Sequence, residues 1–177
     1  LLKKPKMLYL NSLGALNAKH LMAALTDASA VVREHAIKLA ESYLLYSADA
    51  QTAGKIRQRL LALINDPDAT VRYQLAFTLG EPGVVADRSK LLTRLARNSG
   101  SDPWLHAAIL SSLSRGARDL FVELAESGGV KPGVDEAFLV ELARLVGTQK
   151  IPKDIAIILS HLTSSSSPRF ALASAFY

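Results

Sequence analysis

The chain has 177 residues, of which 49% are hydrophobic, and a formal net charge of +5. This length can form one domain with a sizeable core, and the apolar fraction excludes a disordered chain. No uninterrupted apolar run reaches the ~18 residues that a membrane-spanning helix needs. Cysteine is absent, which excludes disulfides, thiolate metal sites, covalent haem attachment and cysteine nucleophiles within these residues. The modest positive charge suits solubility, although it also allows a nucleic-acid, membrane or acidic partner.

The first half of the chain is predicted to be a series of helices separated by turns. Asp68 follows a proline turn and can cap a helix by accepting hydrogen bonds from free backbone N–H groups. Gly80 is a suitable C-cap for the same helix. The small-residue stretch 47–54 is expected to be a loop. The predicted helices cover residues 6–16, 18–26, 31–46, 55–64 and 69–80.

The second half is predicted to continue in the same way. Trp104 follows a turn proline at the start of a helix, where we expect it to pack against a loop, with a ligand contact as the alternative. The predicted helices cover residues 89–97, 104–114, 118–126, 135–146 and 152–162, and a further apolar pattern follows at Phe170, Leu172 and Phe176. With about eleven helices and no convincing strand, the chain is predicted to be all-α.

One segment occurs twice, with an acidic turn residue, a valine and an arginine in the same order. The two copies lie 39 residues apart and comprise Asp27, Val32 and Arg33, and then Asp66, Val71 and Arg72. Apolar residues at every fourth position predict a buried stripe at Val71, Leu75 and Leu79, with a fainter copy at Leu105, Ile109 and Leu113. A helix pair that recurs with this period indicates a solenoid, because each pair must cover the apolar face of its neighbour.

We therefore expect a right-handed α-solenoid of about four to five helix pairs forming one domain over residues 1–177. Its units are approximately 1–16 (partial), 17–46, 51–81, 86–114, 116–147 and 151–177. The first unit lacks a partner helix and the chain ends on apolar residues, where a terminal cap would be polar. The chain is therefore expected to be a fragment of a longer protein.

The two copies resemble the HEAT repeat family, and spacing extends the resemblance over nearly the whole chain. In HEAT proteins the aspartate lies between the two helices, and the arginine lies early in the second helix and helps to tie the inter-repeat loops. The second helices line a concave surface. His106 stands where the third copy would carry the arginine, and the units near Val134 and Arg169 keep only spacing and apolar character.

The segments 10–41, 71–81 and 102–117 are also similar to the HEAT segment of large exported bacterial proteins. Those proteins join a β-propeller related to sugar dehydrogenases to HEAT repeats and a C-terminal c-type haem domain. The resemblance implies a spacer between two redox-related domains, an exported or periplasmic location and no chemistry in this segment.

No motif for catalysis, cofactor binding or metal binding is evident in the sequence. The histidines His20, His35, His106 and His161 lie on four different predicted helices without metal-ligand spacing. The paired carboxylates at Asp66 and Asp68 are explained as turn and capping residues. We expect no catalytic residue, no cofactor and no metal, and a protein partner or a neighbouring domain of the same chain.

Two surfaces are candidates for contact with a partner. Arg33 and Arg72 could face an acidic partner, but bonding to the turn aspartate and to loop carbonyl groups is favoured. Tyr73 and Phe77 could form an aromatic patch, but packing between repeats is favoured. The expected concave surface comprises Arg33, Lys38, Arg72, Tyr73, Trp104 and His106. The alternative is a nucleic-acid site on a basic stripe of first helices, for which a solvated face is favoured, comprising Arg57, Arg59, Arg88, Lys90, Arg94 and Arg97.

Overall fold

The computed structural model describes residues 4–98, 100, 102–113, 116–126 and 134–164. Every regular element in these ranges is helical, which confirms the all-α prediction. The chain divides into two compact units, Leu1–Arg88 and Ser89–Tyr177 (unit 1 and unit 2). None of the described helices combines the length and the apolar character needed to cross a membrane.

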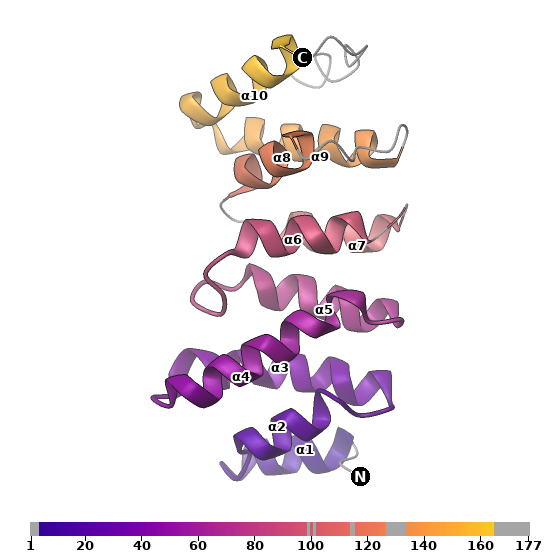
Figure 1. Ribbon diagram of the computed structural model, residues 1–177, viewed down its shortest axis with the longest axis vertical. Coiled ribbons are helices and arrows are strands. Elements are labelled where there is room, and N and C mark those ends of the chain that lie inside the picture. Colours follow the sequence, from indigo (N-terminus) through magenta and orange to yellow (C-terminus); the bar gives the residue numbers. More distant parts are fainter. Residues whose placement is uncertain (1–3, 99, 101, 114–115, 127–133, 165–177) are drawn as a thin grey trace. The chain divides into compact units, whose positions relative to one another are not determined.

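Unit 1 is built on the packing of α3 against α5, which are the second helices of the two copies found in the sequence. The helix α2 packs on α3 and α4, and α1 packs on α3. Burying whole apolar faces in this way supplies most of the stability of such helices. The elements, visible in Figure 1, are α1 (Lys4–Ser12), α2 (Ala18–Ala24), α3 (Ala30–Tyr46), α4 (Ala50–Ala62), the 3-10 helix η1 (Leu63–Asn65) and α5 (Ala69–Gly80).

In unit 2 the helix α9 packs against α7, α8 and α10, and α8 also packs against α10. Phe121 on α8 and Leu142 on α9 are fully or almost fully buried. The elements are α6 (Arg88–Arg97), which begins at the unit boundary, α7 (Pro103–Ser112), α8 (Ala117–Glu126), α9 (Val134–Gln149) and α10 (Pro152–Ser164). Both predicted stripes are confirmed. The residues Val71, Leu75 and Leu79 of α5 are buried, and so are Leu105, Ile109 and Leu113 in and just after α7.

Short polar side chains begin the helices, as expected for N-caps. The Asp68 carboxylate accepts a hydrogen bond from the Thr70 N–H at 2.9 Å, which confirms the predicted cap of α5. Asn17 caps α2 and Asp102 caps α7 in the same manner. Each cap satisfies backbone donors that the helix itself leaves without a partner.

We expect the Asp68 cap to make stability depend on acid pH. Hydrogen bonds from the Thr70 hydroxyl and N–H lower the pKa of Asp68 below its ordinary value of 3.8. A lowered folded-state pKa means that the contribution is present above the ordinary value and is lost as the pH falls through the folded value. The Tm loss caused by Asp68→Ala should therefore be larger at about pH 7 than at about pH 2. Asp68→Asn, which caps without titrating, should keep its advantage over alanine at both pH values.

The prediction of a loop over residues 47–54 is wrong from residue 50 onward, because α4 begins at Ala50. Asp49 caps this helix by accepting from the Thr52 N–H at 3.0 Å, and alanine has the highest helix propensity. Gly80 ends α5 as predicted, but Glu81 is the C-cap, and the left-handed backbone occurs later, at Gly83 with φ 88°. The described ranges contain ten α-helices and one 3-10 helix where about eleven helices were expected. The apolar pattern at 170–176 lies outside the described residues.

Two glycines in different backbone conformations, Gly54 in a helix and Gly83 at positive φ, test the assigned backbone by substitution with alanine. Gly54 lies inside α4, and a Cβ built there meets nothing within 4 Å. Gly54→Ala should therefore raise the free energy of unfolding by about 0.5–1 kcal/mol. Gly83→Ala should lower it by roughly 1–2 kcal/mol, because φ is positive and the new Cβ would lie 3.2 Å from Leu45 Cδ2. Urea unfolding of both variants measures the two effects, and changes of the same sign would contradict the assignment.

Candidate partner-binding surface

Arg33 ties its own turn to the turn of the following copy. Its Nε donates to Asp66 Oδ2 at 2.7 Å and its Nη2 donates to Asp66 Oδ1 at 2.8 Å. The Nη1 group donates to the carbonyl oxygens of Asp27 and Ala28, both at 2.9 Å. The side chains of Arg33 and Asp66 are only 12% and 3% exposed, and the hydrogen bonds to Asp66 raise the pKa of Arg33. The bonding expected for this arginine is confirmed, and its guanidinium is engaged by the protein itself.

Arg72 makes the equivalent bonds to its own turn. Its Nη1 donates to the carbonyl oxygens of Asp66 at 2.6 Å and Pro67 at 3.1 Å, as Arg33 does 39 residues earlier. The expected bonding to loop carbonyls is thus confirmed here too. Its Nε is buried and has no partner among the described residues. The arginines at equivalent positions of the two copies therefore both bond to the turns.

Unit 1 does carry an exposed patch on its second helices. Lys38 on α3 and Phe77 on α5 occupy equivalent positions, 39 residues apart, on two helices that pack together. Phe77 is 44% exposed, so the expectation that it packs between repeats is wrong. Tyr73, one turn earlier on α5, is half-buried. We call these three residues the α3–α5 face.

Trp104 and His106, both on α7 in unit 2, differ in their surroundings. Trp104 is 73% exposed, so the predicted packing against a loop is wrong. The Asp102 cap fixes Trp104 in the first turn, while Leu105 supplies the buried side of the helix. His106 stacks on Phe138 of α9, with ring centroids 4.3 Å apart and planes at 18°. His106 is thus part of the α7–α9 packing, and Trp104 presents its indole to the surface.

The predicted basic stripe separates into residues with different tasks. Arg57 Nε donates to the Val84 carbonyl at 2.6 Å, and Arg88 Nη1 donates to the Gly80 carbonyl at 3.2 Å. These bonds hold the loop after α5, where Val84 is fully buried. Arg59 is half-buried. The exposed members of the set are three of the four on α6, namely Lys90, Arg94 and Arg97.

A polar network between α3 and α5 was not predicted. The fully buried Thr78 hydroxyl donates to Glu41 Oε1 at 2.5 Å, and Gln74 Nε2 lies 3.4 Å from the same oxygen. The sequence signal was a polar pair one turn apart on an otherwise apolar helix face. This network links α3 to α5 and fixes the register of the two helices.

A second feature that sequence reasoning missed is a row of carboxylates on α8. Its members are Asp119, Glu123 and Glu126, spaced at i, i+4 and i+7. Among the residues that the structure describes, no group of three or more His, Asp or Glu side chains could hold a metal ion. The spacing places these carboxylates along one side of α8. Their charge is opposite to that of the exposed row Lys90, Arg94 and Arg97 on α6.

No family model matches this chain, and searches of the curated proteins and of the solved structures likewise give no match.

Proposed function

We propose that this chain is a segment of a right-handed HEAT-type α-solenoid that acts as a non-catalytic scaffold. Support for the stacking comes from the 39-residue recurrence and from Arg33 and Arg72, which repeat the same bonds in two successive turns. Packing of α3 on α5 within unit 1 fits the same principle. The repeat count of four to five pairs rests on the spacing in the sequence.

The proposed role is to present second-helix surfaces to a protein partner or to a neighbouring domain. The observation that carries it is the exposure of Phe77 on α5, since Leu75, Ala76 and Leu79 of the same helix are fully buried. An exposed aromatic beside a half-buried tyrosine suits a partner's apolar side chain, and Lys38 suits a carboxylate at its edge. In unit 2 the exposed indole of Trp104 is the corresponding anchor.

Nucleic-acid binding through the basic first helices is the weaker proposal. Its support is reduced to Lys90, Arg94 and Arg97, because Arg57 and Arg88 bond backbone carbonyl groups. The carboxylates of α8, the next first helix of unit 2, would repel phosphates. Phosphate neutralisation by three cations predicts a log–log salt slope of about −3, and a slope of zero would exclude this mode.

The narrower proposal is that this chain is the spacer between a β-propeller and a c-type haem domain in an exported bacterial protein. It rests on the resemblance of the three sequence segments and gives the chain an exported or periplasmic location. The flanking reading frame tests it: a propeller before the segment and a CxxCH motif after it are expected. A parent gene that encodes neither would contradict it.

Site-specific photocrosslinking tests the scaffold proposal in the parent protein. We expect a benzophenone amino acid at Phe77 to give a discrete adduct with one partner, because that side chain lies on the α3–α5 face. The matched control is the same label at Gln58, which is exposed on α4. Lys38→Glu should weaken the Phe77 adduct. Equal labelling at both positions, or no adduct at Phe77, would contradict the proposed surface.

A further inference from the structure

The helices α6 and α8 of unit 2 share one register with opposite charge. Their buried residues correspond at a spacing of 29 positions: Leu91, Leu92 and Leu95 on α6 match Leu120, Phe121 and Leu124 on α8. Two helices that bury the same positions must also expose the same positions. In chain order α6 precedes α7 and α8 precedes α9, and α8 packs against α9.

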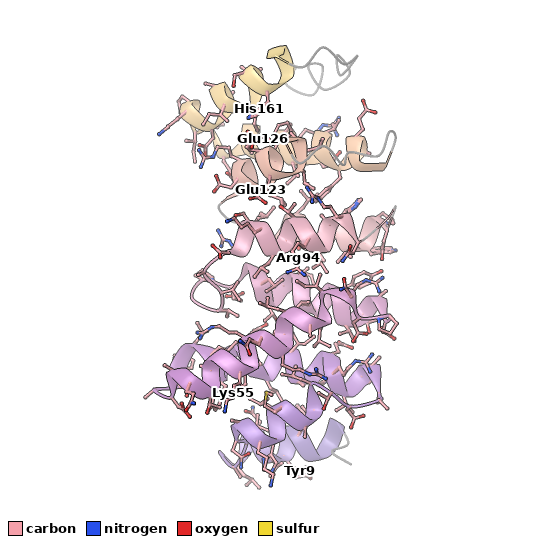
Figure 2. All side chains as sticks on the ribbon, viewed as in Figure 1. Tyr9, Lys55, Arg94, Glu123, Glu126 and His161 are labelled. Atoms are coloured by element: carbon pink, nitrogen blue, oxygen red, sulfur yellow. The ribbon has the colours of Figure 1, made fainter. Side chains whose placement is uncertain are left out.

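The exposed positions carry three cations on α6 and three carboxylates on α8, again 29 positions apart. The α6 cations are Lys90, Arg94 and Arg97, and the α8 carboxylates are Asp119, Glu123 and Glu126. All six are exposed or half-exposed. Figure 2 labels Arg94 of the first row and Glu123 and Glu126 of the second.

The two outer carboxylates have local cationic neighbours, whereas the middle one does not. Arg118 contacts Asp119, and His161 Nε2 of α10 lies 3.7 Å from Glu126 Oε1. Among the described residues, Arg94 and Glu123 take part in no ion pair, although each lies at the centre of its row. Lys90 and Arg97 likewise take part in no ion pair among the described residues, so the whole α6 row and the central carboxylate of the α8 row have no counter-charge there.

We propose that unit 2 binds a second copy of this chain through the outer faces of α6 and α8. A face with a basic row and an acidic row is self-complementary about a two-fold axis parallel to the helices and midway between the rows. This symmetry sets α6 of each copy opposite α8 of the other and forms the Arg94–Glu123 pair twice. The flanking pairs join Lys90 to Asp119 and Arg97 to Glu126. A nucleic acid would meet the carboxylates as well as the cations, so the charge pattern favours the second copy.

Exposed ion pairs are individually weak and are screened by salt. The association is therefore weak, and it requires low ionic strength and high protein concentration. The proposal concerns first helices, so it is independent of partner binding by the α3–α5 face, and either can fail without the other.

Sedimentation equilibrium of the 177-residue chain tests the proposal by charge exchange. The wild type should dimerise at low salt and dissociate in ~1 M salt, where the screening length is ~3 Å. Arg94→Glu and Glu123→Arg should each be monomeric, because each opposes like charges twice. Their equimolar mixture should form a one-to-one heterodimer, because both contacts then join opposite charges. Lys55→Glu, the same reversal at an exposed position of α4, should leave dimerisation unchanged.

Circular dichroism should show wild-type helix content for both variants. A wild type that stays monomeric at every salt concentration would overturn the proposal. A mixture of the two folded variants that fails to associate would also overturn it. Mixing the variants should restore association only if Arg94 of one copy pairs with Glu123 of the other, and a non-specific attraction would not be restored in this way. Stoichiometric binding of a DNA duplex by α6 in place of self-association would assign the cations to another partner.

Discussion

Replacing Asp66 by alanine is expected to lower the free energy of unfolding by roughly 3 kcal/mol. The substitution removes both hydrogen bonds that Arg33 makes to the carboxylate at 2.7 and 2.8 Å and leaves the guanidinium 12% exposed without its counter-charge. It also removes the acceptor of the Asp68 N–H. Guanidinium chloride unfolding followed by circular dichroism gives the loss directly.

The matched control is Asp27→Ala, at the equivalent position of the preceding turn. Among the described residues, the Asp27 carboxylate accepts a single hydrogen bond, from the Ser29 N–H at 2.9 Å, so a loss of about 1 kcal/mol is expected. A double-mutant cycle with Arg33→Ala isolates the pair, and it should give a coupling energy of about 1–3 kcal/mol. Equal losses for Asp66→Ala and Asp27→Ala would show that the two turns are not tied by this pair.

Leu75→Ala is expected to cost about 3 kcal/mol, because a fully buried leucine leaves a cavity when it is truncated. Leu75 has no exposed surface on α5, where that helix packs against α3. Phe77→Ala, two residues further along the same helix, removes a side chain that is 44% exposed and should change the stability by at most about 1 kcal/mol.

The two variants also separate packing from recognition. Phe77→Ala should shift the Tm much less than Leu75→Ala does and should lose the crosslinked adduct of a label at Tyr73, whereas Leu75→Ala should lower the Tm whether or not a partner is present. If Phe77→Ala destabilised the chain as much as Leu75→Ala, Phe77 would be a core residue and the α3–α5 face would lose its anchor.

Most helices and their buried sides follow from the sequence because they depend on local chemistry. Fourfold spacing predicted the buried stripe of Val71, Leu75 and Leu79, and the turn before it predicted the Asp68 cap. The recurrence of Asp and Arg predicted that Arg33 bonds to a turn aspartate and to loop carbonyl groups. These signals lie within one helix or one repeat, where propensity and periodicity decide the outcome.

The predictions that were wrong concern the exposure of aromatic side chains and the residue at which a helix begins. Trp104 was expected to pack, since large aromatics usually do, but its position relative to the buried side of α7 decides its exposure. Phe77 is exposed for the same reason, because neighbouring positions on α5 already fill the contact with α3. Ala50 was assigned to a loop because small residues also mark turns, although the Asp49 cap starts a helix there. The opposite rows on α6 and α8 became evident only when the buried positions gave the two helices a common register.

The arrangement of the repeats can be tested by one distance between two spin labels. The chain has no cysteine, so labels can be placed uniquely at Lys19 on α2 and Lys153 on α10, both exposed. A solenoid separates these helices by four repeat spacings of roughly 8–10 Å each, which predicts a distance of about 35 Å. Labels at Lys19 and Gln58, on the packed pair α2 and α4, are the short-distance control. A Lys19–Lys153 distance of about 35 Å is the result that the account predicts, and a distance close to that of the control pair would show a closed bundle and contradict it.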